Sequence, residues 1–554
     1  MVRFLLVFCF LLSSFGLCRG QTVHNLEIVW QRRGPGLDEC AYGQAMAGGD
    51  VNGDGRSDII ITLRANDVGP FHGQVLIFTD ITDTIADIVL TNLDTVVSQY
   101  GYAVCTGDFN HDGYADVAVG GHKYAPGNTM DGKVYVYYGG NPMDNLLDWS
   151  KTHPNSSEWF GCSVSSGDVN GDGIDDLIVG ALGFPPNALG WVYIYFGDTL
   201  GLHLTHDAKL NGHIEAGYYE NFGNSVSGGG DMTGDGIDDI LVGAYNNSGN
   251  GLAAGKVYLY QGGTAIDTIP KAWFYGEGAW QWLGHGNVSI VSSDAFSFNS
   301  LGWFGTESWP LTTGLGGRGK CYAISGESTG LLTPYFTATG NNDSSGLGFW
   351  SSSSGCSDEN RLEDFVAGAA YEDNGRGAVY LWLRRSPMNS DYDAYILGRY
   401  NNPPSRGDVL GARVAQAGDV DGDGKDEFLI SNYFADSSHM VWFCKYTGPN
   451  AVEEQPNAFH NARPLFLTQN CPNPFASITS VRCHLPCRGR TTVKVYSING
   501  QLVRTLVDGV MGPGAHAMTW DGRDGMGRRV TPGIYIYKLT SGINSATKKM
   551  LLIK

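Results

Sequence analysis

A nine-residue acidic loop returns at nearly regular intervals along this chain. Its pattern is Asp-x-Asn-x-Asp-Gly-x-x-Asp with small variations, and clear copies begin at Asp50, Asp108, Asp168, Asp231 and Asp419. The steps between the first four copies are almost equal, and the step from Asp231 to Asp419 is close to three of them. A regular period of this kind indicates one structural unit repeated along the chain. Two further copies are therefore expected between Asp231 and Asp419.

Each clear copy carries oxygen-bearing side chains at positions 1, 3, 5 and 9, and glycine at position 6 permits a sharp turn. Hard oxygen ligands around a tight turn are what Ca²⁺ requires, and the backbone carbonyl of position 7 can join them. The pattern therefore predicts about five Ca²⁺ ions per chain. The alternative is a set of Asx turns that only join strands. The predicted ligands, with position 7 included for its carbonyl, are Asp50, Asn52, Asp54, Arg56, Asp58, Asp108, Asn110, Asp112, Tyr114, Asp116, Asp168, Asn170, Asp172, Ile174, Asp176, Asp231, Thr233, Asp235, Ile237, Asp239, Asp419, Asp421, Asp423, Lys425 and Glu427.

The residues that follow each loop separate it from an EF-hand. An EF-hand requires a bidentate Glu at position 12, with helices on both sides. Position 12 is apolar in all five copies: Ile61, Val119, Val179, Val242 and Ile430. Each loop instead runs into a short, β-branched apolar stretch that ends near glycine, which is typical of a buried strand. The repeated unit is predicted to be strand–loop–strand.

Landmarks outside the loops locate the two hidden copies. An aromatic residue or Leu followed by Gly precedes every loop, and a glycine with an alternating aromatic run follows it. Leu347-Gly348 precedes a copy at 356–364 in which Cys356 replaces the first ligand. Leu283-Gly284 precedes a stretch through Asp294 that has lost nearly every ligand. The total is seven units over roughly residues 25–450, and the fifth and sixth are expected to bind no metal.

The Phe-Gly landmarks, the Gly-Ala landmarks and the acidic loops occur in one order throughout. In this combination the chain resembles the FG-GAP repeats of integrin α-subunit heads and related bacterial surface proteins. The resemblance covers about three quarters of the chain and implies an all-β, seven-bladed β-propeller over residues 21–450, with Ca²⁺ in inter-strand loops. Radial stacking agrees with the strand pattern, because a unit of four short strands cannot bury both faces alone. Residues 24–30 can complete the sheet of the last blade.

The composition shifts near residue 450, where a polar, Pro-containing stretch at 451–466 is predicted to be a linker. Residues 467–554 alternate like strands, with an Asn499-Gly500 hairpin turn, and predict a small Ig-like β-sandwich. The order of Asn-Pro-Phe, Asn-Gly, Trp-Asp-Gly, Gly-Ile-Tyr and a terminal Lys-Lys-Met-Leu-Leu is similar to the C-terminal sorting domain of bacterial type IX secretion substrates. That resemblance implies export across two membranes, contact with the secretion machinery and removal of this domain. The alternative is a sandwich that only adds stability or interactions.

Residues 1–20 have the pattern of a signal peptide, with a basic start, an apolar core over 4–12 and a cut after Gly20 or Gly16. No later segment has 18 uninterrupted apolar residues, so no membrane span is expected in the mature chain. The nine cysteines after Gly20 are odd in number and scattered, unlike a dense disulfide framework. A net charge of −20 argues against a nucleic-acid partner, which requires clustered Lys and Arg. We expect a protein that is secreted or attached to a bacterial cell surface.

Several short motifs match patterns of enzymes or adhesion proteins, but their positions favour a structural role. Ser328 lies in a G-x-S-x-G match, but the repeat register places it in a turn after a strand and not before a helix. A G-x-G-x-x-G match at 314–319 precedes a strand, and the Arg-Gly-Asp at 406–408 is short enough to arise by chance. Five tryptophans crowd the fifth unit, where they either pack or bind sugar rings or a protein partner: Trp273, Trp280, Trp282, Trp303 and Trp309.

The sequence therefore predicts a non-catalytic, calcium-binding propeller for adhesion or recognition of a protein or glycan ligand at the cell surface. Fold alone does not identify that ligand. One alternative is an enzyme or glycan-binding accessory protein that uses the central face of the propeller. That alternative requires clustered acids or histidines on the inner strands. The other is a structural component of a surface layer.

Overall fold

A computed structural model describes residues 22–553, except 35–39, 66–72, 82–84, 95, 97, 126–129, 154–156, 184–188, 216, 293–299, 307–316, 328, 342–344, 359, 361, 386–390, 399–408, 433–438, 449–465, 468–472, 474, 486–488, 512–513 and 542–543. The chain forms two compact units, Met1–Asn450 and Ala451–Lys554. The predicted signal peptide and linker lie outside the described residues, apart from Phe466. Across the described ranges, no helix is long and apolar enough to cross a membrane.

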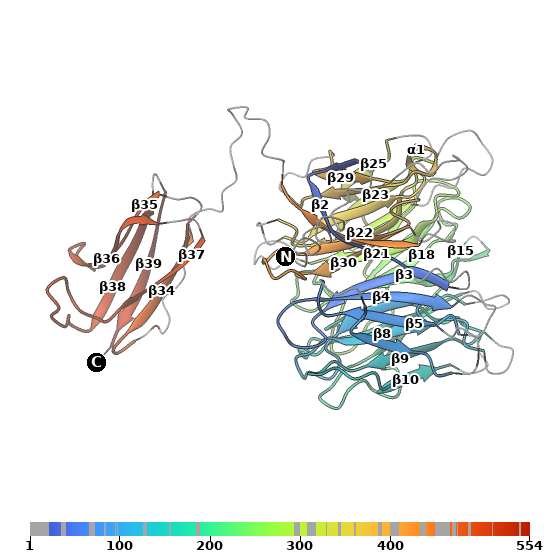
Figure 1. The fold of residues 1–554 in the computed structure, drawn as a ribbon, viewed down its shortest axis with the longest axis horizontal. Coiled ribbons are helices and arrows are strands. Elements are labelled where there is room, and N and C mark those ends of the chain that lie inside the picture. Colours follow the sequence, from blue (N-terminus) through green and yellow to red (C-terminus); the bar gives the residue numbers. More distant parts are fainter. Residues whose placement is uncertain are drawn as a thin grey trace, which may run out of the picture. The chain divides into compact units, whose positions relative to one another are not determined.

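The first unit is built from seven mainly antiparallel sheets of four or five strands, coloured from blue to orange in Figure 1. The first sheet contains β3 (Cys40–Gly49), β4 (Asp58–Ala65), β5 (Gln74–Phe78) and β6 (Ile88–Thr91). The second contains β7 (Ala103–Gly107), β8 (Asp116–Gly121), β9 (Lys133–Tyr137) and β10 (Trp149–Thr152). The third contains β11 (Phe160–Gly167), β12 (Asp176–Ala181), β13 (Trp191–Tyr195) and β14 (Ala208–Asn211).

The fourth sheet contains β17 (Phe222–Ser227), β18 (Ile240–Ala244), β19 (Lys256–Tyr260) and β20 (Ala272–Tyr275), with β24 (Gly330–Leu331) added in parallel. The fifth contains β21 (Leu283–Val291), β22 (Leu301–Thr306), β23 (Lys320–Ser325) and β25 (Pro334–Thr339). The sixth contains β26 (Leu347–Gly355), β27 (Asp364–Ala369), β28 (Ala378–Trp382), β29 (Ala394–Leu397) and β1 (Thr22–His24). The seventh contains β30 (Arg413–Gly418), β31 (Glu427–Ser431), β32 (Met440–Tyr446) and β2 (Leu26–Arg33). A small hairpin of β15 (Ile214–Glu215) and β16 (Tyr218–Tyr219) and a helical turn, α1 (Glu372–Gly375), complete the unit.

The first strands of the seven sheets form a closed ring. β3, β7, β11, β17, β21, β26 and β30 each contact the next in this order, and β30 contacts β3. The N-terminal strand β2 pairs with β32 and so completes the seventh sheet from the opposite end of the chain. This pairing is the one expected for residues 24–30. The all-β propeller expected from the repeats is therefore present.

The strands are apolar on both faces because each sheet packs between two others. Ile178 and Val192 of the third sheet share a core cluster with Val242 and Tyr258 of the fourth, and all four are almost fully buried. The two degenerate units expected between Asp231 and Asp419 form the fifth and sixth sheets. Stacking in a ring thus supplies the contacts that one isolated sheet would lack.

Glycine landmarks mark where neighbouring sheets approach most closely. A Cβ atom on Gly120 of β8 would lie 2.1 Å from the carbonyl oxygen of Gly161, in β11 of the next sheet. Gly180 and Gly223 repeat this approach between the third and fourth sheets, again at 2.1 Å. Gly161 also has a φ of 83°, a conformation that favours glycine. The Phe-Gly and Gly-Ala landmarks are thus two sides of one contact.

The tryptophans around the fifth unit do not form one cluster. Trp303 on β22 is fully buried, and its ring lies 4.8 Å from that of Phe365. Trp273 belongs to the fourth sheet, whereas Trp280 is 53% exposed. Trp309 lies outside the described residues. The packing interpretation therefore holds for Trp303, and the expected crowding in one unit is wrong because Trp273 pairs with Tyr258 of β19.

The second unit is a two-sheet β-sandwich. One sheet contains β33 (Phe466–Leu467), β34 (Thr479–Leu485) and β37 (Gly514–Trp520), and the other contains β36 (Leu502–Met511), β35 (Gly489–Ser497), β38 (Gly533–Ser541) and β39 (Asn544–Leu552). The Asn499-Gly500 turn joins β35 to β36, as the sequence predicted. The aromatic landmarks meet in the core, where Phe475 packs 5.6 Å from Trp520 and Trp520 packs 5.1 Å from Tyr535.

The close approach at Gly120 predicts a strong effect of a single methyl group. Gly120→Ala should lower the free energy of unfolding by about 1–3 kcal/mol, because backbone atoms of the next sheet leave no room for a Cβ. Gly140→Ala is the control, since its Cβ would meet nothing closer than 3.7 Å, and it should change stability by less than about 0.5 kcal/mol. Urea unfolding of both variants provides the measurement. Equal stabilities would show that the sheets can separate to admit the methyl group.

Candidate metal loops and a central cavity

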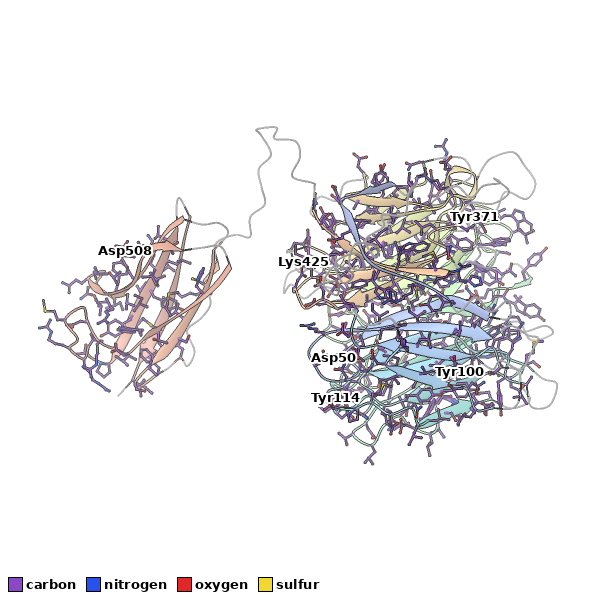
Figure 2. All side chains as sticks on the ribbon, viewed as in Figure 1. Asp50, Tyr100, Tyr114, Tyr371, Lys425 and Asp508 are labelled. Carbon is purple, nitrogen blue, oxygen red and sulfur yellow. The ribbon has the colours of Figure 1, made fainter. Side chains whose placement is uncertain are left out.

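All five predicted loops connect the first strand of a sheet to its second strand. Asp50 follows β3 and Asp58 begins β4, and the second, third and seventh loops repeat this placement, while the fourth loop lies between β17 and β18. Because the sheets share one strand order around the ring, the loops gather at one end of the first unit. Figure 2 labels Asp50, Tyr114 and Lys425, which come from three different loops, at this end. Each loop is therefore a separate candidate site built from consecutive residues.

The third loop shows how the local sequence brings the oxygen atoms together. Asp168 accepts hydrogen bonds from the backbone N–H groups of Asp172 at 2.9 Å and Gly173 at 2.8 Å. The side-chain amide of Asn170 contacts both Asp172 Oδ2, at 3.0 Å, and Asp176 Oδ1, at 3.2 Å. Positions 1, 3, 5 and 9 are thus held close by the turn itself. This donor set of carboxylate and amide oxygens suits a hard divalent cation.

The bond from glycine at position 6 to the first aspartate recurs in all five loops. The donors are Gly55, Gly113, Gly173, Gly236 and Gly424, and the distances are 2.7–3.0 Å. These glycines have φ angles of 84–89°, which a residue with a Cβ adopts only under strain. The loop fold predicted from the spacing is therefore the same at every copy.

The acid at position 9 is buried and also ties the loop to its sheet. Asp176 is fully buried, and its Oδ2 accepts a 3.1 Å bond from the N–H of Val169, while its Oδ1 accepts a 3.0 Å bond from Gly197 after β13. The same bond from position 2 is accepted by Asp58, Asp116, Asp239 and Glu427. In the sixth unit Asp364 keeps it too, although the first ligand there is Cys356. Position 9 therefore has a structural role even in a copy without a complete ligand set.

Burial makes these position-9 acids hard to ionise without a cation. Desolvation raises the pKa of Asp58 and Asp116 to about 7, and that of Asp239 to about 6. Desolvation likewise raises the pKa of Asp176 and Glu427 to about 8. Neighbouring loop carboxylates add to each rise, since like charges disfavour the ionised form. A bound cation would reverse both effects, so the electrostatics of the loops fit metal binding.

Position 8, which was not among the predicted ligands, links each loop to the loop before it. The backbone N–H of Ala115 donates to the carbonyl of Asp50 at 2.9 Å, and that of Ser57 donates to Asp419 at 3.0 Å. Where position 8 is an aspartate, its side chain accepts a second bond, as when Asp108 N–H donates to Asp175 at 2.9 Å. Among the described residues, such bonds join the loops of the sixth, seventh, first, second, third and fourth sheets in that order. The acidic residues at position 8 of several copies were the available signal for this role.

The seventh loop has the densest acidic group. Asp419, Asp421 and Asp423 offer ligand oxygens that all lie within 4.8 Å of one another. The sixth unit differs: Asn360 donates its side-chain N–H to the carbonyl of Arg384, at 3.0 Å. The fifth loop, with Asp294, lies outside the described residues. The Asp419 loop is therefore well formed, whereas the sixth unit places an amide against backbone instead of against a partner ligand.

The other motifs provide no separate site among the described residues. Ser328 and residues 406–408 lie outside those residues, but the strand β23 before Ser328 is followed by β24 and not by a helix. Residues 314–316 also lie outside them, and Gly319 directly precedes β23. Among the cysteines with described side chains, Cys105, Cys162, Cys321, Cys444 and Cys483 are free thiols.

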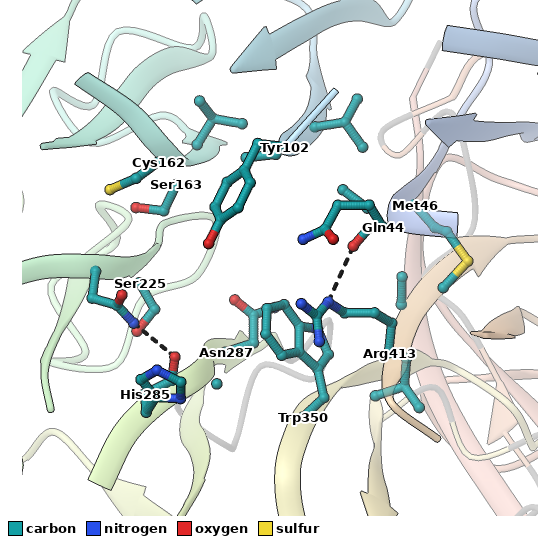
Figure 3. A pocket seen from close by; sticks show the side chains of 18 of the residues that line it. Gln44, Met46, Tyr102, Cys162, Ser163, Ser225, His285, Asn287, Trp350 and Arg413 are labelled. Atoms are coloured by element: carbon teal, nitrogen blue, oxygen red, sulfur yellow. Dashed lines mark hydrogen bonds between the residues drawn. The ribbon is translucent and has the colours of Figure 1, made fainter. Parts of the chain in front are cut away.

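A cavity of about 190 Å³ opens where the seven inner strands converge. Figure 3 shows Gln44, Tyr102, His285, Trp350 and Arg413 around it. The Arg413 guanidinium stacks 3.9 Å from the centre of the Trp350 ring and donates from Nε to the Gln44 carbonyl at 3.1 Å. Gln44 is 3% exposed, and its Oε1 has no hydrogen-bond partner among the described residues. A buried polar atom of this kind is costly unless a ligand or water meets it.

Family models match both units of the chain. The FG-GAP repeat matches residues 100–137, 160–195 and 222–260, which span the second, third and fourth sheets from the first strand to the third. The FlgD Ig-like domain matches residues 486–545, within the sandwich. The two matches agree with the two kinds of unit that the strands form.

The similar curated proteins are integrin α chains. Integrin alpha-PS2 of Drosophila melanogaster is 30% identical over 223 residues, covering 38% of this chain and 16% of that protein. Integrin alpha pat-2 of Caenorhabditis elegans is 31% identical over 230 residues, covering 38% and 18%, and integrin alpha-7 of Mus musculus is 35% identical over 170 residues, covering 29% and 14%. The chain spans less than a fifth of the length of these three relatives.

Two solved structures overlap the chain. FlgD from P. aeruginosa is 25% identical and covers 13% of this chain and 58% of its own, with a TM-score of 0.12. PorZ, a surface component of the type IX secretion system of Porphyromonas gingivalis, is 13% identical and covers 94% and 60%, with a TM-score of 0.38. The repeat matches, the integrin relatives and the closed ring of sheets support an FG-GAP β-propeller, here followed by an Ig-like domain.

Proposed function

We propose that the protein is an exported, non-catalytic β-propeller that binds Ca²⁺ and recognises a ligand at a cell surface. The observation that carries the proposal is the set of preorganised oxygen loops in a propeller whose repeats are similar to those of integrin α chains. The signal-peptide pattern at residues 1–20 supports export. The similarity to integrin α chains supports adhesion or ligand recognition at a surface.

The donor chemistry favours Ca²⁺ over other cations. Each loop offers carboxylate, amide or hydroxyl oxygens and neither thiolate nor imidazole among its predicted ligand side chains. Ca²⁺ accepts six to eight such ligands in a flexible arrangement, whereas Mg²⁺ demands a smaller octahedron and softer metals favour sulfur or nitrogen. A cation bound by Asp168, Asn170, Asp172 and Asp176 would neutralise charge that the fold forces together.

Calcium should stabilise the propeller more strongly as pH rises. Because burial raises the folded pKa of Asp58, Asp116 and Asp176 above that of the unfolded chain, the metal-free fold loses stability between about pH 4 and pH 8. Ca²⁺ binds the ionised carboxylates and offsets this loss. Melting curves with excess Ca²⁺ and with chelator should therefore differ little near pH 5 and most near pH 8. A melting temperature that does not respond to Ca²⁺ at either pH would contradict calcium binding.

We place ligand recognition at the central cavity, where the lining residues favour a carboxylate ligand. Arg413 is a permanent cation that is 8% exposed, and no Asp or Glu is among the described residues lining the cavity. The guanidinium already donates from Nε and Nη1 to the carbonyls of Gln44 and Ala412, and its positive charge favours an anionic ligand. Gln44 adds an acceptor for a ligand hydroxyl or N–H. The volume of about 190 Å³ suits one sugar acid or one acidic side chain.

An array of acidic glycans, acidic peptides and their neutral counterparts tests this site. The full mature chain should bind acidic members and ignore neutral ones. Gln44→Leu should weaken that binding by about tenfold, because the lost acceptor is buried against the ligand. Gln74→Leu, on the outer part of the first sheet, is the matched control and should bind like the parent. Equal binding of acidic and neutral members, or no loss in Gln44→Leu, would overturn the placement.

We also propose that the second unit directs export through a type IX pathway, as the order of its landmarks implies. Phe475 of the Asn-Pro-Phe motif pairs with the last strand, where it accepts a 2.8 Å bond from Ile553 and donates a 3.0 Å bond to Leu551. The motif is therefore tied by backbone hydrogen bonds to the end of β39. Deletion of residues 467–554 in a host with that pathway should leave the propeller in the periplasm. Surface display of the truncated chain would contradict the sorting role.

A further inference from the structure

We infer that the seventh loop, Asp419–Glu427, is neutralised by the ammonium of Lys445 and binds no calcium ion. Lys445 Nζ lies 2.5 Å from Asp421 Oδ2, 2.5 Å from Asp423 Oδ2 and 3.7 Å from Glu427 Oε1. These acids are positions 3, 5 and 9, the predicted ligands of that loop. The inference rests on the proposed function, in which the other complete loops bind Ca²⁺.

The position of Lys445 on its sheet explains why it reaches the loop. Cys444 of β32 pairs with Phe428 of β31, so Lys445 lies beside Glu427, the position-9 acid. This register position, one residue beyond the third strand's last pairing with the second, exists in every sheet with a complete loop. The residues found there in the first four sheets are Thr79, Tyr138, Phe196 and Gln261. None of these carries a charge.

The fourth loop provides an intermediate case. Gln261 Nε2 donates a 2.5 Å bond to Asp235 Oδ2, at position 5 of that loop. The register position therefore does point its side chain at the loop acids in a second sheet. A neutral amide leaves the charge of the acids uncompensated, whereas the ammonium of Lys445 compensates it. Only the lysine substitutes for the charge of a metal ion.

The seventh loop has one more acid at its predicted ligand positions than the other complete loops, as expected if a lysine neutralises it. Position 3 is Asp421, whereas the other complete loops have Asn or Thr there. Lys445 contacts this additional carboxylate at hydrogen-bond distance, as it also contacts Asp423. A Ca²⁺ ion at the same ligands would have to displace the ammonium and break both short contacts. Two cations sharing these oxygens would repel each other strongly at such separations.

The location of this loop suggests why independence from calcium is useful. Its Asp419 carbonyl accepts the 3.0 Å bond from Ser57 that joins the last loop to the first. Lys445 itself pairs with Glu27 on β2, the N-terminal strand that completes the seventh sheet. The place where the ring closes thus carries a positive charge that belongs to a side chain of the protein itself. The ring can remain closed when free calcium is scarce.

Counting bound calcium in the full mature chain tests the inference. Metal analysis after equilibrium dialysis in excess Ca²⁺ should give four ions, held by the loops at Asp50, Asp108, Asp168 and Asp231. Lys445→Met should gain one ion. Thr79→Lys, which installs an ammonium at the matching position of the first sheet, should lose one. Asp172→Ala should also lose one and calibrates the count.

The outcomes separate this inference from the proposed function. Five ions in the parent, or an unchanged count in Lys445→Met, would overturn the internal cation and leave calcium binding intact. No bound calcium in any variant would overturn calcium binding itself. Should Lys445→Met fail to fold, Lys445→Gln and the count lost by Thr79→Lys decide the question, because an unchanged count in both would equally contradict the inference.

Discussion

Closure of the ring depends on the hydrogen bonds that join each acidic loop to the next. From the sixth loop through the seventh to the fourth, within the described part of the chain, the N–H of position 8 donates to the carbonyl of position 1 in the loop before it, and Ser57 joins the first loop to the seventh through Asp419. The N-terminal strand β2 reinforces the same place by pairing with β32. A sheet that is apolar on both faces must be covered on both, and the neighbouring sheets of the ring supply that cover here. The loops therefore connect neighbouring sheets whether or not they bind a metal ion.

This arrangement has an electrostatic consequence. The joints are made from aspartates, and the position-9 acids are buried beside other carboxylates of their own loop, which raises their pKa. Folding therefore concentrates negative charge at one end of the propeller, and a cation there would neutralise it. In our proposal a divalent cation neutralises the carboxylates of four loops, and the ammonium of Lys445 neutralises those of the seventh. In the sixth unit Cys356 replaces the acid at position 1, while the buried Asp364 remains at position 9.

Most of the fold was predictable because its causes are local and repeated. The spacing of the loops located the units, the apolar runs after them identified strands, and the Leu-Gly landmarks located the fifth and sixth sheets without a metal loop. The oxygen atoms that each loop gathers were predictable for the same reason, since positions 1 to 9 follow one another along the chain. Interpretation was weaker for the tryptophans, because Trp273 is close to the fifth unit in sequence but belongs to the fourth sheet.

The sequence by itself determined the repeat, the strand–loop–strand unit and the oxygen atoms offered by each loop, because these depend on residues that are neighbours along the chain. Only the tertiary structure decided which distant residues meet those atoms. Lys445 lies on β32, beyond an intervening strand, and Ser57 belongs to the first loop of the chain, yet both contact the seventh loop. The central cavity arises in the same way, from Gln44, Trp350 and Arg413 on three separate strands. Register between strands and closure of the ring create these contacts, and neither is encoded in any single repeat.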